Sequence, residues 1–296
     1  NEAIWEGGAV SAYSDARPLL VNVTVYGNHA ERYAGAFYAS AETYITVRNA
    51  LVWGNTTNGS GGPIYLFPGT SMSIGQTIAE GGCPSGAGCA EVYGIDPRFI
   101  DAPNGDFRLQ PTSPAIDFGS NAHYPDAAGE VDFVGNRRSH GASIDLGAYE
   151  FQGERVFEPG VIELDRTTLS FGPIFVGQTS AAQTVTLTNG GAHLLGIRSV
   201  QLTGPNTGSF QLISEDCGGA RLFPGRSCAI SVRFDPNEPG DLSAILRITQ
   251  EGGHGHTDIE LNGRTFVNNR LYVDSAATGA GTGHRSRVGS HDPPDV

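Results

Sequence analysis

The 296-residue sequence predicts an all-β protein with two folded regions. Three observations lead to this fold class. The N-terminal third repeats with a fixed period, glycine occurs at 42 positions, and strand-like segments follow one another at regular spacing after about residue 160. Glycine is at roughly twice its average share without the every-third spacing of collagen, so it indicates many tight turns. The length suits about two domains, and 39% hydrophobic residues suffice for their cores.

The period of the N-terminal region is 27 residues, which separates Asn1, Asn28 and Asn55. A fixed period of this size indicates a solenoid, in which each unit buries its apolar face against the next. Three short strands per unit match one coil of a right-handed parallel β-helix, with residue n stacked over residue n+27 at the ~4.8 Å strand spacing. The columns that keep the step are Gly8/Gly35/Gly62, Val10/Phe37/Ile64, Asn22/Asn49/Gln76, Val25/Val52/Ala79 and Gly27/Gly54/Gly81.

The columns of the repeat predict different roles. Apolar columns such as Val25/Val52/Ala79 should point inward and bury one another. Aromatic columns are expected to pack, with stacking on sugar rings as the alternative; they contain Trp5, Tyr26, Tyr38, Trp53 and Tyr65. Asparagine columns should form hydrogen-bonded ladders at the corners, a structural role rather than a ligand-binding one. The ladder residues expected are Asn1, Asn28, Asn55, Asn22 and Asn49.

The four cysteines occur as two close pairs, Cys83 with Cys89 and Cys217 with Cys228. Each pair predicts a local disulfide that closes a Gly- and Pro-rich loop, contributes roughly 2 to 3 kcal/mol, and requires an oxidising compartment. Zinc is the alternative, although neither pair has the CxxC spacing of structural zinc sites. The disulfide interpretation places the protein outside the cell or on its surface.

A linker at 153–160 precedes the second predicted domain, residues 161–264. Seven short strands separated by Gly, Pro and Asn turns indicate an immunoglobulin-type β-sandwich. The predicted strands are LDRTTLSFG, QTVTLTN, GIRSVQLTG, SFQLIS, CAISVRFDP, SAILRITQ and DIELNG.

Several strings resemble known bacterial families. GGAVSAYSDARPLLVNVTVYGN and AGAFYASAETYITVRNALVWGN resemble the repeats of secreted right-handed β-helix proteins. DPRF, NGDFRL, SPAID and IDLGAYE, in that order, resemble the closing region of the exported surface proteins called choice-of-anchor Q. The resemblance implies coils over residues 1–100 and a closing region over 101–153.

The second domain resembles another module of such proteins. LSFGPIFVGQTSAAQTVTLTNGG and LFPGRSCAISVRFDPNEPGDLSAILRI are similar to choice-of-anchor D, related to the abnormal-spindle and Hydin sandwich domains. In that pattern the cysteine before the PGxSC turn pairs with the second, which supports a Cys217–Cys228 bond. The tail, 265–296, begins like a further β-helix domain and then loses all periodicity, so we expect the start of another domain or disorder.

Charge narrows the possible partners. All 18 basic residues are Arg, and 31 acidic residues give a net charge of −13. Such an acidic chain is an unlikely partner for nucleic acid, which needs clustered positive charge. Without Lys, the chain has no Schiff-base nucleophile and no P-loop. No apolar run approaches the ~20 residues of a membrane span.

Two groups of acidic residues are candidate sites. Asp15 and Glu42 share a column near Arg17, and carboxylates beside a base are the machinery of polysaccharide lyases of this fold; the alternative is a solvated turn column, since the third coil has Gly69 there. The second group suits calcium, which takes hard oxygen ligands, or else caps turns. Its members are Asp117, Asp132 and Asp145, with Asp126 and Glu150 nearby.

No other cofactor is predicted, and His254 with His256 is a weak metal candidate. Because no nucleophile, base and orienting group assemble in the sequence, we expect a non-catalytic adhesion, display or spacer module. Its partners would be a polysaccharide, bound along the β-helix face, or a host or matrix surface. The alternative is the downstream part of a polysaccharide lyase or glycoside hydrolase.

Overall fold

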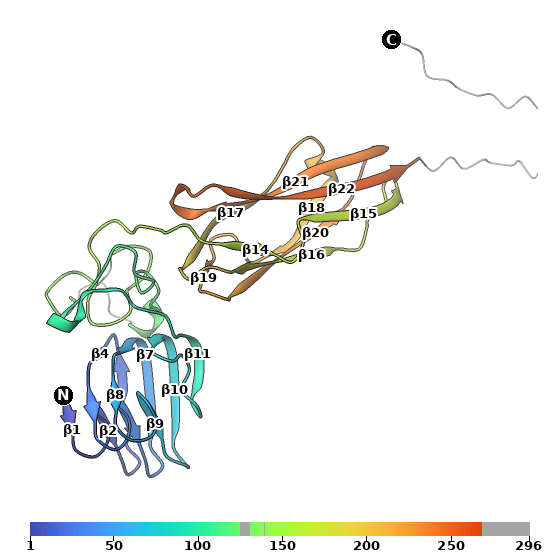
Figure 1. Cartoon of the computed structure of the whole chain (residues 1–296). Helices are drawn as coiled ribbons and strands as arrows, with labels where there is room; N and C mark the ends of the chain where they lie inside the picture. Colours follow the sequence, from blue (N-terminus) through green and yellow to red (C-terminus); the bar gives the residue numbers. More distant parts are fainter. Residues whose placement is uncertain (125–130, 139, 268–296) are drawn as a thin grey trace, which may run out of the picture.

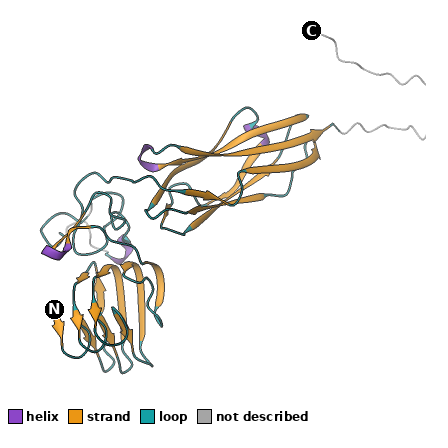
Figure 2. Ribbon diagram, in the orientation of Figure 1, coloured by secondary structure: helices purple, strands orange, loops and turns teal. Residues whose placement is uncertain are grey.

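The computed structural model describes residues 1–124, 131–138 and 140–267. Figure 1 shows a stack of parallel strands at the N-terminus, a loop-rich segment beside it, and a sandwich of long strands. Figure 2 shows that strands make up most of the regular structure of both parts. The predicted all-β class is confirmed. Most of the tail predicted at 265–296, and Asp126, lie outside the described residues.

The N-terminal stack contains three parallel sheets, and its pairing register is the period of the sequence. Val10 pairs with Phe37, and Val25 with Val52, each 27 residues apart. The two agree because similar units stacked one above another bring residues at equivalent positions into contact. One sheet is β1 (Glu2–Ala3), β5 (His29–Ala30) and β8 (Thr56–Thr57); another is β2 (Val10–Ala12), β6 (Phe37–Ala39) and β9 (Ile64–Leu66). The third has β3 (Leu19–Val21) and β4 (Thr24–Tyr26) beside β7 (Tyr44–Trp53), then β10 (Ser71–Ala79) and β11 (Gly88–Tyr93).

The corners of the stack account for two glycine columns. Gly27, Gly54 and Gly81 all have positive φ, a conformation that glycine adopts without steric cost. Gly35 is different, because a Cβ there would collide with the backbone of Thr56 in the next unit. The Gly27/Gly54/Gly81 column therefore needs glycine for its positive φ, whereas Gly35 is needed because the backbone of the next unit lies too close for a side chain.

The 27-residue register ends at β11. Ser73 of β10 pairs with Gly88 of β11, only 15 residues later. The intervening chain turns back through the loop closed by Cys83 and Cys89 instead of completing another unit. The last strand therefore joins only one of the three sheets.

The loop-rich segment, which consists of residues 94–124, 131–138 and 140–160, packs against the second half of β7 and β10. Its apolar residues form a cluster with Leu51 and Ile78, which lie on the outer face of those strands. Backbone contacts fix it further, since Gly147 N donates to Asn49 O and Ala148 N donates to Thr24 Oγ1. Its regular elements are β12 (Phe99–Asp101), η1 (Ala102–Asn104), β13 (Asp106–Leu109) and η2 (Asn121–His123).

The C-terminal part is a two-sheet sandwich around one apolar core. The seven predicted strand segments each contain a strand, and β14 and β19 are two short additions. One sheet has the order β14 (Ile162–Leu164), β16 (Gln183–Asn189), β20 (Ser227–Phe234), β18 (Phe210–Glu215). The other has β15 (Thr168–Phe175), β22 (His256–Phe266), β21 (Gly240–Gln250), β17 (Leu195–Thr203), β19 (Arg221–Leu222). The short helices η3 (Thr207–Ser209) and η4 (Glu251–Gly253) lie in connections.

The sandwich core follows the alternation of its strands. In β20 every second residue is buried, ending with Phe234, which is fully buried against Phe171 and Phe210. Alternation with period 2 places one face of each strand inside and the other in solvent. The Cys217–Cys228 disulfide belongs to the same core.

Candidate functional site

One asparagine column forms a hydrogen-bonded ladder. Asn28 Nδ2 donates to Asn55 Oδ1 at 2.9 Å, and Asn1 joins the ladder through its main-chain nitrogen, which donates to Asn28 Oδ1 at 3.2 Å. Asn55 Nδ2 continues to Val25 O at 2.8 Å, and both Asn28 and Asn55 are buried. These amides therefore satisfy the backbone at the corner and are not available to a ligand.

The second asparagine column has another basis. Asn22 and Asn49 have φ near 50°, the left-handed region in which Asn is enriched, and Gln76 continues the column at φ 42°. Asn49 bonds to Ser120 of the loop-rich segment in both directions, at 2.9 and 3.1 Å. Among the described residues, the buried Asn22 side chain has no hydrogen-bond partner. The predicted Asn22–Asn49 ladder is therefore absent from the described residues. The column instead provides the left-handed backbone conformation of the corner, and Asn49 hydrogen-bonds to Ser120 of the loop-rich segment.

The aromatic columns pack in two places. Tyr38 and Tyr65 are paired in register, and their rings are stacked at 6.1 Å with Tyr33 beside Tyr65 at 5.2 Å. At the other place, Tyr26 pairs with Trp53 and lies against the rings of the loop-rich segment. Trp5 is 62% exposed and has Arg32 over its ring.

The lyase-like column lies in an exposed turn. Asp15 and Glu42 both have φ 60°, and Gly69 continues the column at φ 89°. Their carboxylates form no hydrogen bond or ion pair with the part of the chain that the structure describes, and the same holds for Arg17. The requirement for a positive φ explains the change from Asp and Glu to Gly, and no base is held beside the two carboxylates.

The three calcium candidates each cap a different stretch of backbone. Asp117 Oδ1 accepts from Ala142 N at 2.8 Å. Asp132 accepts from the amides of Val134, Asn136 and Glu150, and these bonds outweigh burial to hold its pKa below the usual value. Asp145 accepts from Asp117 N at 2.7 Å and from Phe151 N at 2.6 Å.

Asp145 and Glu150 form a buried acidic pair with shifted titration. Burial raises the pKa of Asp145 to about 7, against the opposing effect of its two amide donors. Burial together with the Asp145 charge raises the pKa of Glu150 to about 9. Arg138 lies 3.9 Å from Glu150 and donates to Gly147 O and Ala148 O. Because the carboxyls interact, the two titrate as a pair rather than independently.

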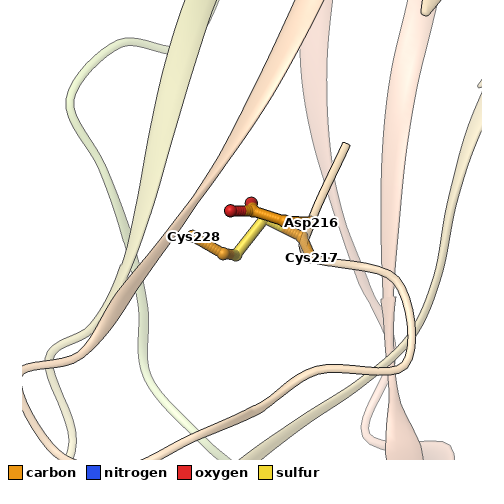
Figure 3. A group of neighbouring side chains, drawn as sticks. All are labelled: Asp216, Cys217 and Cys228. Carbon is orange, nitrogen blue, oxygen red and sulfur yellow. A yellow bond between two sulfur atoms is a disulfide. The ribbon is translucent and has the colours of Figure 1, made fainter. Parts of the chain in front are cut away.

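Within the described ranges, one group of three potential ligands has its donor atoms within 4.8 Å of one another, and it does not include the calcium candidates. Figure 3 shows this group, Asp216, Cys217 and Cys228, with the two sulfurs joined. Disulfide sulfurs carry no thiolate charge for a metal, and Asp216 Oδ1 is occupied by Ala229 N at 2.6 Å. The group is therefore structural.

Both predicted disulfides, Cys83–Cys89 and Cys217–Cys228, are confirmed, and the zinc alternative is not needed. The two histidines considered as a metal pair have separate partners. His254 Nε2 lies 2.7 Å from Phe157 O, and His256 lies 3.8 Å from Asp258.

The junction between the stack and the sandwich is built on stacked aromatic rings. Phe223, in the loop closed by Cys217 and Cys228, stacks on Tyr93 at the end of β11 with centroids 3.6 Å apart. Phe118 packs edge-on against Phe223, with ring centroids 4.7 Å apart. The guanidinium of Arg226 lies over the Tyr93 ring, 5.3 Å from its centroid. Phe223 is only 1% exposed, although it belongs to a loop outside the sandwich strands.

Ion pairs surround these rings. Arg221 of β19 donates to Asp117 O at 3.0 Å and lies 3.7 Å from the Asp117 carboxylate. Arg155 donates to Ile116 O at 2.7 Å, and burial lowers its pKa to about 10. Glu158, in the linker, lies 2.8 Å from Arg98 and 3.0 Å from His193. Several of these contacts are well removed from solvent, so they define one relative placement of the two parts.

The sequence reasoning missed this junction. Tyr93 and Phe223 are 130 positions apart and fall in no shared repeat or motif. The one local signal is an aromatic residue beside the Pro-Gly turn of a disulfide-closed loop, LFPGRSC. A ring at a turn normally faces solvent, so it suggests a docking contact without naming the partner.

A groove crosses the junction on the side of Arg98. A cavity of about 560 Å³ lies between Tyr26, Trp53, the β12 strand and Glu158. A second cavity of about 220 Å³ shares Asp96, Arg98 and Thr112 with the first and extends to His193.

Comparison with protein families identifies the C-terminal part. Residues 160–264 match the family model described as HYDIN/CFA65/VesB-like, Ig-like domain. The strand arrangement agrees with this match, so the predicted immunoglobulin-like domain is confirmed.

Solved structures resemble about a third of the chain. The Vibrio cholerae VesB protease is 21% identical over 35% of this chain and 32% of its own, with a TM-score of 0.29. The secreted serine protease VesC from Vibrio cholerae is 16% identical over 36% of this chain and 23% of its own, also at 0.29. The ASH/PapD-like domain of human CEP192 is 15% identical over 36% of this chain and 85% of its own, at 0.29. No curated protein matches the chain significantly.

Of the helices in the described ranges, none has the length and hydrophobicity needed to cross a bilayer.

Proposed function

We propose that the chain is a non-catalytic spacer or display module of an exported bacterial surface protein. In this proposal the parallel stack is the end of a right-handed β-helix, residues 94–160 close its flank, and the immunoglobulin-like domain is held at a fixed angle beyond them. Two disulfides are compatible with an oxidising compartment outside the cytoplasm.

The main support for this proposal is the stacking of Phe223 on Tyr93. Tethered domains usually join through polar interfaces and move relative to each other. Here a fully buried ring, an edge-on Phe118 and the Arg221–Asp117 pair lock the sandwich to the stack. A rigid joint transmits position and force along a chain of modules, which is what a spacer must do.

The proposal is tested by measuring how rigid the joint is. Spin labels at Asn58→Cys in the stack and Thr168→Cys in the sandwich, both exposed, report the distance between the two parts by pulsed electron resonance. A spacer predicts one narrow distance distribution, and Phe223→Ala should broaden it. Phe133→Ala is the matched control, because that ring is 76% exposed and outside the junction.

A broad distribution in the unmodified protein would contradict the spacer function. An enzymatic role is checked separately by incubating the chain with acidic and neutral polysaccharides. Formation of unsaturated ends or new reducing ends would show a lyase or hydrolase instead.

A further inference from the structure

The groove at the junction has the volume of a ligand-binding site. Its larger cavity, about 560 Å³, falls within the 300 to 1,000 Å³ typical of ligand pockets, which often lie between domains. The smaller cavity, about 220 Å³, continues it past Arg98 to His193 and Leu194 of the sandwich. A ligand of several linked units would therefore contact the stack, the loop-rich segment and the sandwich together.

One end of the groove offers aromatic surface. Tyr26 and Trp53 are partners in adjacent parallel strands, so their side chains leave the sheet on the same side. Tyr26 is held by Phe99 edge-on at 5.8 Å and by Phe107 at 5.2 Å. Trp53 is half-buried, and it makes no ring-to-ring contact within the described part of the chain. Trp53 lines the cavity.

The polar lining consists mainly of hydrogen-bond acceptors held in place by local bonds. Asp96 Oδ1 accepts from Arg98 N at 2.8 Å, and Asp101 Oδ2 accepts from Asn104 Nδ2 at 2.8 Å. Gln110 Nε2 donates to Phe99 O at 2.8 Å, which orients its amide. An ionised carboxylate can accept several further bonds and donates none, so a matching ligand must present many donors. Hydroxyl groups meet this requirement.

The charge of the groove excludes anionic ligands. Arg98 is the basic side chain lining the larger cavity, and Glu158 lies 2.8 Å from it. Asp96 and Asp101 remain without a basic partner in the described residues, so the local field is negative, like the net charge of −13. Uronic acid polymers, phosphates and nucleic acids would be repelled.

We propose that this groove binds a neutral oligosaccharide, with one pyranose ring lying on Trp53 and its hydroxyls donating to Asp96 and Asp101. The C–H face of a pyranose is apolar and weakly positive, which suits the negative face of an indole ring. This site goes beyond the spacer function and does not depend on it. If the joint is rigid and the chain has no affinity for sugars, only the proposed sugar site is contradicted and the spacer function stands.

The test uses the full chain carrying Trp5→Phe, which leaves Trp53 as its single tryptophan. Neutral hexasaccharides of β-1,4-glucan, β-1,4-xylan, β-1,4-mannan and α-1,4-glucan are titrated while Trp53 fluorescence is followed. At least one should give a saturable change with a Kd below about 1 mM, while hexagalacturonate gives none. No response to any neutral sugar at about 10 mM, or a response only to a charged probe, would overturn the proposal.

Variants then locate the site by calorimetry with the best sugar. Trp53→Ala should weaken binding about tenfold or more, and Trp53→Phe, which keeps a ring, about threefold. Asp101→Asn should weaken it several-fold. The matched controls are Trp5→Ala at the far end of the stack and Asp106→Asn, whose carboxylate pairs with Arg108 outside the groove.

Circular dichroism and thermal melting establish that each variant is folded. If Trp53→Ala does not fold, Trp53→Phe and Asp101→Asn still decide the question. Unchanged affinity in the folded groove variants, or equal losses in the two controls, would show that the sugar binds elsewhere.

Discussion

The parallel stack and the sandwich both bury an apolar core, but they differ in how far apart in the sequence the paired residues are. In the stack each buried residue rests on its counterpart 27 positions away, as Val25 does on Val52. In the sandwich, partners have no constant separation: Leu187 pairs with Cys228 and Ile245 with Glu260. A constant separation is visible as a repeat, whereas variable separations leave only the alternation within each strand. Contacts at a regular separation can therefore be predicted from the sequence more easily than contacts at variable separations.

The difference also has energetic consequences, because stacked repeats interact mainly with neighbours and a sandwich folds around one shared core. We expect the two regions to unfold separately unless the junction couples them. Trp5 and Trp53 are the chain's two tryptophans, and residues 161–264 contain neither Trp nor Tyr. Tryptophan fluorescence therefore reports the stack, and far-ultraviolet circular dichroism reports both regions.

The largest expected effect comes from the sandwich core. Phe234→Ala removes a fully buried ring and should lower the free energy of unfolding of the sandwich by about 3 to 5 kcal/mol. In urea, the dichroism transition should move while the fluorescence transition stays. Leu51→Ala, at a 1% exposed position in the stack, should do the reverse. Equal shifts of both signals in both variants would mean that the two regions unfold as one unit.

Removing the sandwich disulfide should have the next largest effect. Cys217→Ala with Cys228→Ala frees a loop with a sequence separation of 11 and should cost roughly 2 to 3 kcal/mol, measured by urea denaturation. The loss should exceed that from Cys83→Ala with Cys89→Ala, which opens an exposed loop with a separation of 6. Each double variant should become insensitive to reduction of its own loop. Equal or reversed losses would contradict the ordering.

The acidic pair predicts a pH dependence confined to the first region. Folding raises the pKa of Asp145 to about 7 and of Glu150 to about 9, so the folded state binds protons more tightly than the unfolded one. Stability from this pair is complete below about pH 4 and is lost as pH rises through about 7 and 9, the folded-state pKa values of the two acids. Fluorescence-detected unfolding at pH 5, 7 and 9 measures it.

The matching variant for this prediction is Glu150→Gln, which imitates the protonated acid. It should flatten the decline between pH 5 and pH 9, while Glu154→Gln, on an exposed residue nearby, should leave it unchanged. A decline that persists in Glu150→Gln would remove the pair as its cause.

The smallest effect is expected at the surface of the sandwich. Arg247 and Asp258 face each other across β21 and β22 with two hydrogen bonds of 2.8 Å. Exposed pairs of this kind contribute little to stability, and salt weakens them further. Asp258→Asn should therefore lower sandwich stability only slightly, and less at high salt than at low salt, as measured by denaturation under both conditions. A larger, salt-independent loss would indicate a packing role.

Much of the architecture could be predicted from residues close in sequence or in period. The 27-residue columns, the strand segments of the sandwich and both cysteine pairs all rest on spacing, and the structure pairs them accordingly. The asparagine columns were harder, because the same residue type can serve two purposes. Asn28 and Asn55 share a hydrogen bond, whereas Asn22 and Asn49 hold left-handed corners.

By itself, the sequence determined the period, the all-β class and the two disulfides, since these follow from local propensity, repetition and the short reach of a loop. Only the tertiary structure decided that Phe223 would stack on Tyr93, that Asp145 and Glu150 would share a buried site, and that Trp53 would line a groove at the junction. These contacts join segments that no regular spacing relates. Their free energy depends on desolvation and shape, which exist once the parts are packed together.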